Sequence, residues 1–386
     1  MRLSKKALFG AAAAALVAGS ALYLATPQLI RADQASRMEY LTPSVLVQGI
    51  YPSMLGPENT DTNVRLLEAE QPELLWVTGY RADMVGPASN EPRSPEFMCH
   101  NTFSIHDSVD DHAKVMGSGY YLTRRLFTLS QGQSELDFPK GFGIPVSSAE
   151  RFMLQSQVLN LRQDRIGTEV RHRVRTNFVP DREAAQPMKA LTLIDFGIAL
   201  EVVDEQAREM PNNPLSCAGD AGGQPTFHRG DKEMTAHWKV KPGKEKRVTQ
   251  LQRPFRFNTT IHYIAVHLHS HAESLELWDK TANRSVYKAL CKPTDDLQGL
   301  AEVGHYSSEQ GIPVYADHEY ELISHYNNTS NQEQTAMAFM FCYAADPYFQ
   351  KPDAAGLAQR SDEYCSKEPV AAPVAVPAVT PSPGKP

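Results

Sequence analysis

Three of the four histidines in the segment 261–278, IHYIAVHLHSHAESLELW, alternate with other residues and follow a run of apolar side chains. With the two-residue period of a β-strand, successive side chains point to opposite faces. One face then carries Ile264, Val266 and Leu268, and the other carries Ile261, Tyr263, Ala265, His267, His269 and His271. A chain with this segment must place a hydrophobic core on one side of the strand. We therefore predict a strand with one face in a hydrophobic core and the other face rich in imidazole.

His267 and His269 are one residue apart on this face of the expected strand. Side chains at positions i and i+2 of a strand begin about 7 Å apart, so both rings can turn toward one cation. His-x-His on a strand is therefore a compact half-site for a metal ion. A solvated polar face is the alternative interpretation, and His271 on the same face favours the metal.

Short strand-like segments separated by turn signals follow one another along the chain, without a convincing amphipathic helix. This pattern predicts an all-β fold. A length of 386 residues with 41% hydrophobic content is sufficient for two domains with separate cores. We expect two consecutive jelly-roll-like β-sandwich domains at residues 38–203 and 204–348, with the boundary at the start of the polar segment 204–230.

The two ends of the chain differ in composition from the rest. Arg2, Lys5 and Lys6 precede an uncharged run at residues 7–25, which predicts a signal peptide or membrane anchor at residues 1–33. The body of the protein would then be exported, in the periplasm, outside the cell, or anchored facing outside. Residues 366–386 predict a disordered Pro- and Ala-rich tail. A net charge of -7 without a long basic run argues against nucleic acid as a partner, and nothing in the sequence indicates an oligomeric state.

Two other segments with histidine have less specific patterns. The run at residues 106–112, HDSVDDH, lacks the spacing of a known cation-binding loop and is interpreted as a charged surface turn. His172 shares a face with Val174 and Phe178 on the expected strand 169–179. We interpret it as a core or interface histidine rather than a ligand.

A third ligand for the histidine pair is available on the expected strand 335–343, TAMAFMFCY. One face of this strand carries Met337, Phe339, Phe341 and Tyr343. A thioether is a poor ligand for zinc or iron(II) and a good ligand for Cu(I). The alternative is that Met337 only fills the core, as buried methionines commonly do.

With VHLHSH and the distal TAMAFMFCY, the chain resembles the type II copper, ascorbate-dependent monooxygenases, typified by the peptidylglycine α-hydroxylating and dopamine β-monooxygenases. The resemblance spans residues 73–343, largely through the order of elements. It implies that His267, His269 and Met337 ligate the copper at which O2 is activated. It also implies an external one-electron reductant such as ascorbate, and a small-molecule substrate. The pocket beside the copper would be formed by Phe339, Phe341 and Tyr343.

The chain departs from this family at several positions. Cys99 and His100 stand where the first copper site has a His pair, and Gln157 stands where that site has a later His. Cys99 and His100 would therefore build a different copper site, or none. Ala265 replaces the Arg with which the amidating enzyme holds a peptide carboxylate. An apolar or aromatic molecule is therefore a better substrate prediction than a peptide C-terminus.

Disulfide pairing is implied by the resemblance only. In this family a disulfide bond links the start of the second domain to its end, which implies a disulfide between Cys217 and Cys365. Cys291 and Cys342 are then the remaining candidates for a pair, although four cysteines allow several connectivities.

Two other classes of protein stay open. A non-catalytic, exported copper-binding or carrier protein would keep the His-His-Met site without turnover. A cupin-like metalloprotein would use His267, His269 and Glu273 for iron, manganese or zinc, but Ile261 and Lys280 stand where the cupin motif has glycine.

Overall fold

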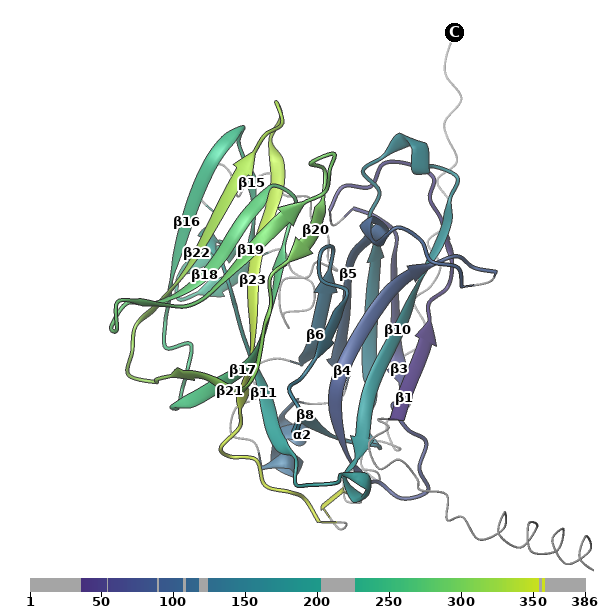
Figure 1. Cartoon of the computed structure of the whole chain (residues 1–386), viewed down its shortest axis with the longest axis vertical. Coiled ribbons are helices and arrows are strands. Elements are labelled where there is room, and N and C mark those ends of the chain that lie inside the picture. Colours follow the sequence, from purple (N-terminus) through teal and green to yellow (C-terminus); the bar gives the residue numbers. More distant parts are fainter. Residues whose placement is uncertain are drawn as a thin grey trace, which may run out of the picture.

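The computed structural model describes residues 36–53, 55–88, 90–106, 109–117, 124–202, 226–353 and 356–357. These residues form an all-β structure of several packed sheets, which confirms the predicted fold class (Figure 1). The predicted signal or anchor segment, the tail, Cys217 and Cys365 lie outside the described residues. Within the described ranges, no helix has the length and hydrophobicity that crossing a membrane requires.

The first sandwich consists of two sheets from the N-terminal half. One sheet has the order β1 (Ser36–Leu41), β10 (Glu169–Pro180), β4 (Leu74–Val85) and β8 (Phe142–Ser147), with β2 (Val45–Leu46) and β7 (Glu135–Asp137) at its sides. The other has the order β3 (Glu58–Val64), β9 (Phe152–Val158), β5 (Met98–Ile105) and β6 (Arg125–Ser130). Apolar side chains of both sheets form one core cluster, with Tyr80 stacked on Phe103 and Phe127.

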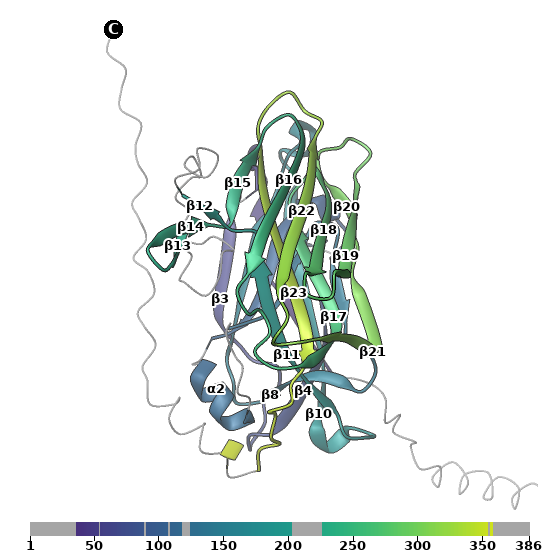
Figure 2. The same cartoon turned by 90° about the vertical axis from the view of Figure 1, so that its left-hand side faces the viewer.

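The second sandwich follows from β11 onward. Its inner sheet contains β11 (Lys189–Gly197), β23 (Gln334–Ala345), β17 (Thr259–Leu268) and β21 (Tyr306–Val314), and β15 (His237–Val240) also pairs with β23. Its outer sheet has the order β16 (Gly243–Leu251), β22 (Tyr320–Asn328), β18 (Ala272–Asp279), β19 (Arg284–Pro293) and β20 (Leu300–Val303), and Figure 2 looks onto it. A second core cluster lies between these two sheets.

Small elements complete the described structure. The strands β12 (Leu200–Glu201), β14 (Lys232–Thr235) and β13 (Thr226–Arg229) form a separate sheet. The helical elements are α2 (Val109–Met116), η1 (Pro95–Phe97), η2 (Gln163–Arg165) and η3 (Asp181–Glu183). The helix α2 differs from the predicted surface turn at residues 106–112: His112 is fully buried and its Nδ1 lies 2.5 Å from Glu150 Oε1. That prediction is wrong, because a buried carboxylate of the first sandwich draws the imidazole inward.

The two sandwiches share a continuous sheet. A short parallel pairing joins Lys189 and Ala190 of β11 to Phe142 and Gly143 of β8. The rest of β11 is antiparallel to β23, although β11 precedes the predicted boundary at residue 204. The inner sheet of the second sandwich therefore has its own core on one face and the first sandwich on the other (Figure 1).

The strand β17 shows this division residue by residue. Tyr263 and Ala265 belong to the first core cluster, and Ile264, Val266 and Leu268 belong to the second, as predicted from the alternation. Two positions differ from the prediction. Ile261 lies in the second core because the register shifts between Ile261 and Tyr263. His271 is not on the strand face, because β17 ends at Leu268 and His271 has a φ of 68° in the following turn.

Candidate metal centre

Four potential ligands lie on the face of the inner sheet that is turned toward the first sandwich. β23 is the central strand, with β15 on one side and β17 on the other. His237 of β15 is directly opposite Met337 of β23, and His267 of β17 is directly opposite Phe339. Continuing this register places His269, one residue past β17, beside Met337. His237, Met337 and His269 therefore form a row across three strands, with His267 one step along β17.

The imidazoles of this row incline toward each other above Met337. Adjacent strands are about 4.8 Å apart, so the backbones at His237 and His269 are separated by about 9.6 Å. The ring centroids of His237 and His269 are only 6.3 Å apart. Those of His267 and His269 are 5.3 Å apart, with the rings nearly perpendicular at 84°. The three rings therefore lie close together on the face of the sheet that carries Met337.

The cluster is buried and its nitrogen atoms are unsatisfied. His237, His267, His269 and Met337 are exposed by 2, 3, 5 and 1%, respectively. By distance and angle, both ring nitrogens of His267 and His269, and Nε2 of His237, have no hydrogen-bond partner among the described residues, although the backbone of Thr335 lies close enough to the His269 ring to act on its pKa. Buried polar atoms are normally hydrogen-bonded, and leaving them unpaired is costly. Unpaired nitrogens from three rings at one place indicate that a partner which the polypeptide does not provide belongs there.

Burial keeps these imidazoles in the neutral form that binds metals. Desolvation lowers the pKa of His267 to about 3 and that of His237 to about 4. The pKa of His269 falls well below its usual value for the same reason, and the neighbouring His267 and His237 contribute. At neutral pH each ring therefore offers a lone pair without first losing a proton.

The donor set fits a soft ion such as Cu(I). Imidazole suits several transition metals, whereas a thioether selects Cu(I). A ring nitrogen binds a metal at about 2.0–2.1 Å, so two rings on one ion have centroids no more than about 6.4 Å apart. The 5.3 Å between His267 and His269 is close to the roughly 5.2 Å of a tetrahedral angle, whereas the 6.3 Å between His237 and His269 is near the limit for rings on opposite sides of an ion. Among the described residues, however, no group of three His, Cys, Asp or Glu side chains already has its donor atoms gathered as for an ion. Side-chain rotation would have to bring the nitrogens together.

Tyr326 of β22 holds two of these residues in place from the outer sheet. Its hydroxyl donates to the carbonyl of Met337 at 2.6 Å and accepts from the backbone N–H of His269 at 3.4 Å. Its ring packs edge-on against Trp238, the residue that follows His237, with centroids 5.5 Å apart. One buried tyrosine thus contacts β15, β23 and the residue that follows β17.

The first sandwich faces the cluster with polar side chains. Positive charge on Arg125 or His100 would lower the pKa of His267, and positive charge on His269 or His237 would lower that of His100. Desolvation is again the main cause of the low pKa of His100, about 3. His100 is buried and directly opposite Gln157, and the thiol of Cys99 is buried next to it. The structure therefore brings His100 to the same interface as the second-domain histidines.

The three predicted pocket residues have different surroundings. Phe339 is half-buried next to Met337. Phe341 and Tyr343 are buried in the core cluster between the sandwiches, where Arg125 lies over the Phe341 ring and the Tyr343 hydroxyl donates to the carbonyl of Leu126 at 2.9 Å. Of the three, Phe339 alone has exposed surface that a ligand can contact.

His172 and Glu273, two side chains named in alternative interpretations, lie elsewhere. His172 is buried in the first sandwich, with Nδ1 3.4 Å from Asn101 Nδ2. Glu273 is exposed on β18 of the outer sheet, away from the buried faces of His267 and His269. The ligand set of a cupin is therefore not assembled.

The sequence pattern did not single out His237. It lies between Ala236 and Trp238 on a short strand, and its alternation with Thr235 and Lys239 was the only signal that it belongs to the polar face. Its place opposite Met337 depends on the pairing of β15 with β23, two segments that are far apart in the chain.

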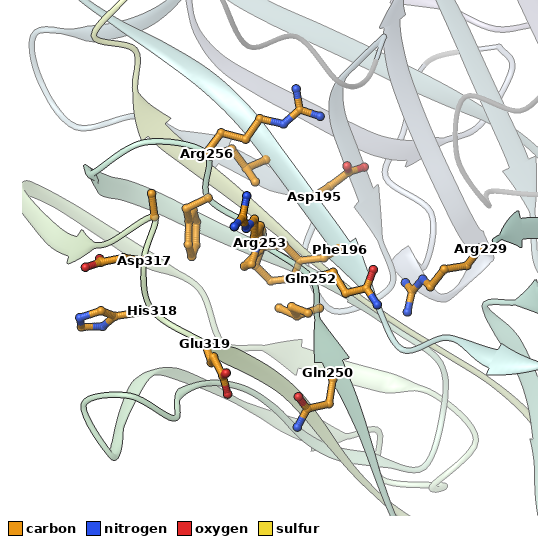
Figure 3. A pocket seen from close by; sticks show the side chains of 15 residues that line it. Asp195, Phe196, Arg229, Gln250, Gln252, Arg253, Arg256, Asp317, His318 and Glu319 are labelled. Carbon is orange, nitrogen blue, oxygen red and sulfur yellow. The ribbon is translucent and has the colours of Figure 1, made fainter.

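A large surface cleft lies away from this centre and contains none of the predicted ligands. It has a volume of about 1370 Å³ between β11, the end of β16 and the turn at residues 316–319. Figure 3 shows Asp195 and Phe196 on one side of it and Arg253 and Arg256 in the loop after β16. Its lining mixes both signs of charge, including Arg229, Asp317, His318 and Glu319.

No protein-family model matches this chain, and no curated protein sequence matches it significantly.

Proposed function

We propose that this protein is a copper-dependent, monooxygenase-like oxidoreductase that uses O2 to hydroxylate a small apolar or aromatic molecule. The observation that carries the proposal is the group of buried, neutral and unpaired imidazoles of His267 and His269 beside the thioether of Met337. These residues would hold the copper, which, when bound, supplies one-electron redox chemistry with O2.

The protein's own residues support three requirements of such chemistry. The position between two sandwiches excludes bulk water from the cluster. The low pKa values of the imidazoles keep them available as ligands at neutral pH. The exposed part of Phe339 next to Met337 offers an apolar contact for the substrate.

Electron supply distinguishes this chain from a protein with two complete copper sites. Hydroxylation inserts one oxygen atom of O2 into a C–H bond and reduces the other to water, which consumes two electrons and two protons. One Cu(I) provides one electron. The remaining electron would come from an ascorbate-like external reductant, or from a second copper at Cys99 and His100, where a buried thiol lies beside a buried imidazole.

The alternative is an exported copper carrier without turnover. Its specific support is the burial of Phe341 and Tyr343, because their rings fill the interface rather than line an open pocket. A carrier would bind copper with the same ligands and show no substrate-dependent consumption of O2.

Copper content and O2 uptake test the proposal. His267→Ala is expected to abolish copper retention, and Met337→Ala to weaken binding of Cu(I) more than that of Cu(II). Unchanged copper content in both variants would refute the site. Copper-loaded protein that consumes no O2 with any reductant and candidate substrate would support the carrier instead. O2 uptake that is lost in Met337→Ala and kept in Cys99→Ser would show that one copper is sufficient.

A further inference from the structure

We propose that His237 is a fourth ligand of this copper and that it closes the coordination shell against O2 in the resting state. The proposal rests on the copper site proposed above. It concerns a residue outside the His-x-His pair and outside the strand of Met337.

The position of His237 supports direct ligation. It is directly opposite Met337 in the pairing of β15 with β23. Residues that face each other in an antiparallel pair project to the same side of the sheet, with Cβ atoms about 4.5–5.5 Å apart. The centroid of the His237 ring also lies 6.3 Å from that of His269. An ion held by Met337 and His269 would therefore lie within reach of His237.

The chemistry of the ring points the same way. His237 is 2% exposed, and its Nε2 is buried without a hydrogen-bond partner among the described residues. His262, a buried histidine on the same sheet, uses both of its nitrogens. His262 Nδ1 lies 3.0 Å from the carbonyl of Ser308, and its Nε2 lies 2.8 Å from the hydroxyl of Thr260. The comparison shows that an imidazole on the same sheet can be satisfied by protein groups where no ion is needed.

A fourth donor changes what the site can do. A metal site with four protein ligands is closed, whereas a catalytic site keeps a position open for its reactant. Three imidazoles and one thioether fill a tetrahedral shell, so O2 could bind only after one donor leaves. His237 is the donor on the short strand β15, which pairs with β23 along four residues. As a fourth donor, His237 would strengthen the retention of Cu(I), and because it fills the position that O2 needs, it would slow the reaction of the reduced site with O2.

The test compares His237→Ala with His262→Ala in the purified full-length chain loaded with one copper ion. Pulsed electron paramagnetic resonance of the Cu(II) form counts the coordinated imidazoles. We expect three in the wild type and in His262→Ala, and two in His237→Ala. Competition with a colorimetric chelator should show Cu(I) binding weakened by more than about tenfold in His237→Ala, and stopped-flow oxidation by O2 should be faster. His237→Met, which restores a soft donor, should recover most of the Cu(I) affinity.

The outcomes separate this inference from the proposed function. Wild-type protein that retains no copper would overturn both. Wild-type protein that loses copper on His267→Ala, with the same imidazole count and Cu(I) affinity in His237→Ala, would overturn the fourth ligand and leave the copper site intact. Circular dichroism identifies a variant that does not fold. If His237→Ala fails to fold, the imidazole count and Cu(I) affinity of His237→Met decide: a count of three would refute ligation by His237.

Discussion

Removing the hydroxyl of Tyr326 should weaken both the fold and the proposed metal centre. In Tyr326→Phe the carbonyl of Met337 loses a 2.6 Å hydrogen bond and the N–H of His269 loses a longer one of 3.4 Å. Tyr326 is 2% exposed, so water does not readily replace its hydroxyl. Leaving one buried group without its partner costs about 1–3 kcal/mol. Because the bond to His269 is at the limit of hydrogen-bonding distance, we count only the bond to Met337. The free energy of unfolding of the copper-free protein should therefore fall by about 1–3 kcal/mol.

The same substitution should loosen copper binding, since Tyr326 fixes the backbone at two proposed ligands. Loss of a group that orients metal ligands typically reduces metal affinity by about 10–100-fold. Urea denaturation of the copper-free protein measures the first effect, and competition with a Cu(I) chelator measures the second.

Tyr320 provides a matched control on the same strand, β22. It is 1% exposed, and its hydroxyl accepts from the N–H of Tyr315 at 2.9 Å and donates to the carbonyl of the same residue at 3.3 Å. Its ring packs edge-on against Phe255, with centroids 5.0 Å apart. Tyr320→Phe should cost comparable stability and leave copper affinity unchanged. Equal Cu(I) affinity in both variants and the wild type would refute the role of Tyr326 at the metal centre.

Three further outcomes are expected. Desolvation lowers the pKa of His172 to about 4 in the folded protein, whereas the pKa in the unfolded chain is about 6.5. Below pH ~6.5 the unfolded state therefore binds more protons than the folded state, and the free energy of unfolding falls as the pH falls. Urea denaturation of His172→Gln should show this fall reduced by up to about 1.4 kcal/mol per pH unit. In Gly197→Ala the new Cβ would lie 2.6 Å from the ring of Phe339, which is opposite Gly197 on the neighbouring strand. This overpacking should lower the free energy of unfolding by about 1–3 kcal/mol. An unchanged midpoint of urea denaturation would contradict the close packing. Peptide mapping without reduction should show Cys291 and Cys342 unlinked, because both are free in the structure.

The last expectation corrects the pairing that the family resemblance left open. Cys342 is fully buried in the core of the second sandwich, and Cys291 is on β19 of the outer sheet. The bond predicted between Cys217 and Cys365 lies outside the described residues and stays a prediction.

Local sequence determined the strands and their faces. The period of two residues placed His267 and His269 on one face, and Met337 and Phe339 on one face of β23. The structure has His267 on β17 opposite Phe339, and His269 one residue past the end of that strand. This is possible because alternation follows from backbone geometry within a single strand. The same rule separated the apolar side chains of both strands into the second core.

Tertiary structure decided which faces meet. His237 reaches Met337 because β15 pairs with β23, and the register between segments so distant in sequence is set by packing and turn geometry rather than by their own alternation. The shift after Ile261 moved that residue into the other core, since a single irregularity in the ladder reverses the faces that follow. The aromatic face of β23 was predicted as a pocket, but the first sandwich covers Phe341 and Tyr343 and leaves Phe339 partly exposed. The sequence by itself therefore specified the donors on each strand, and only the packing of the two sandwiches brought His237 to them and buried the resulting cluster.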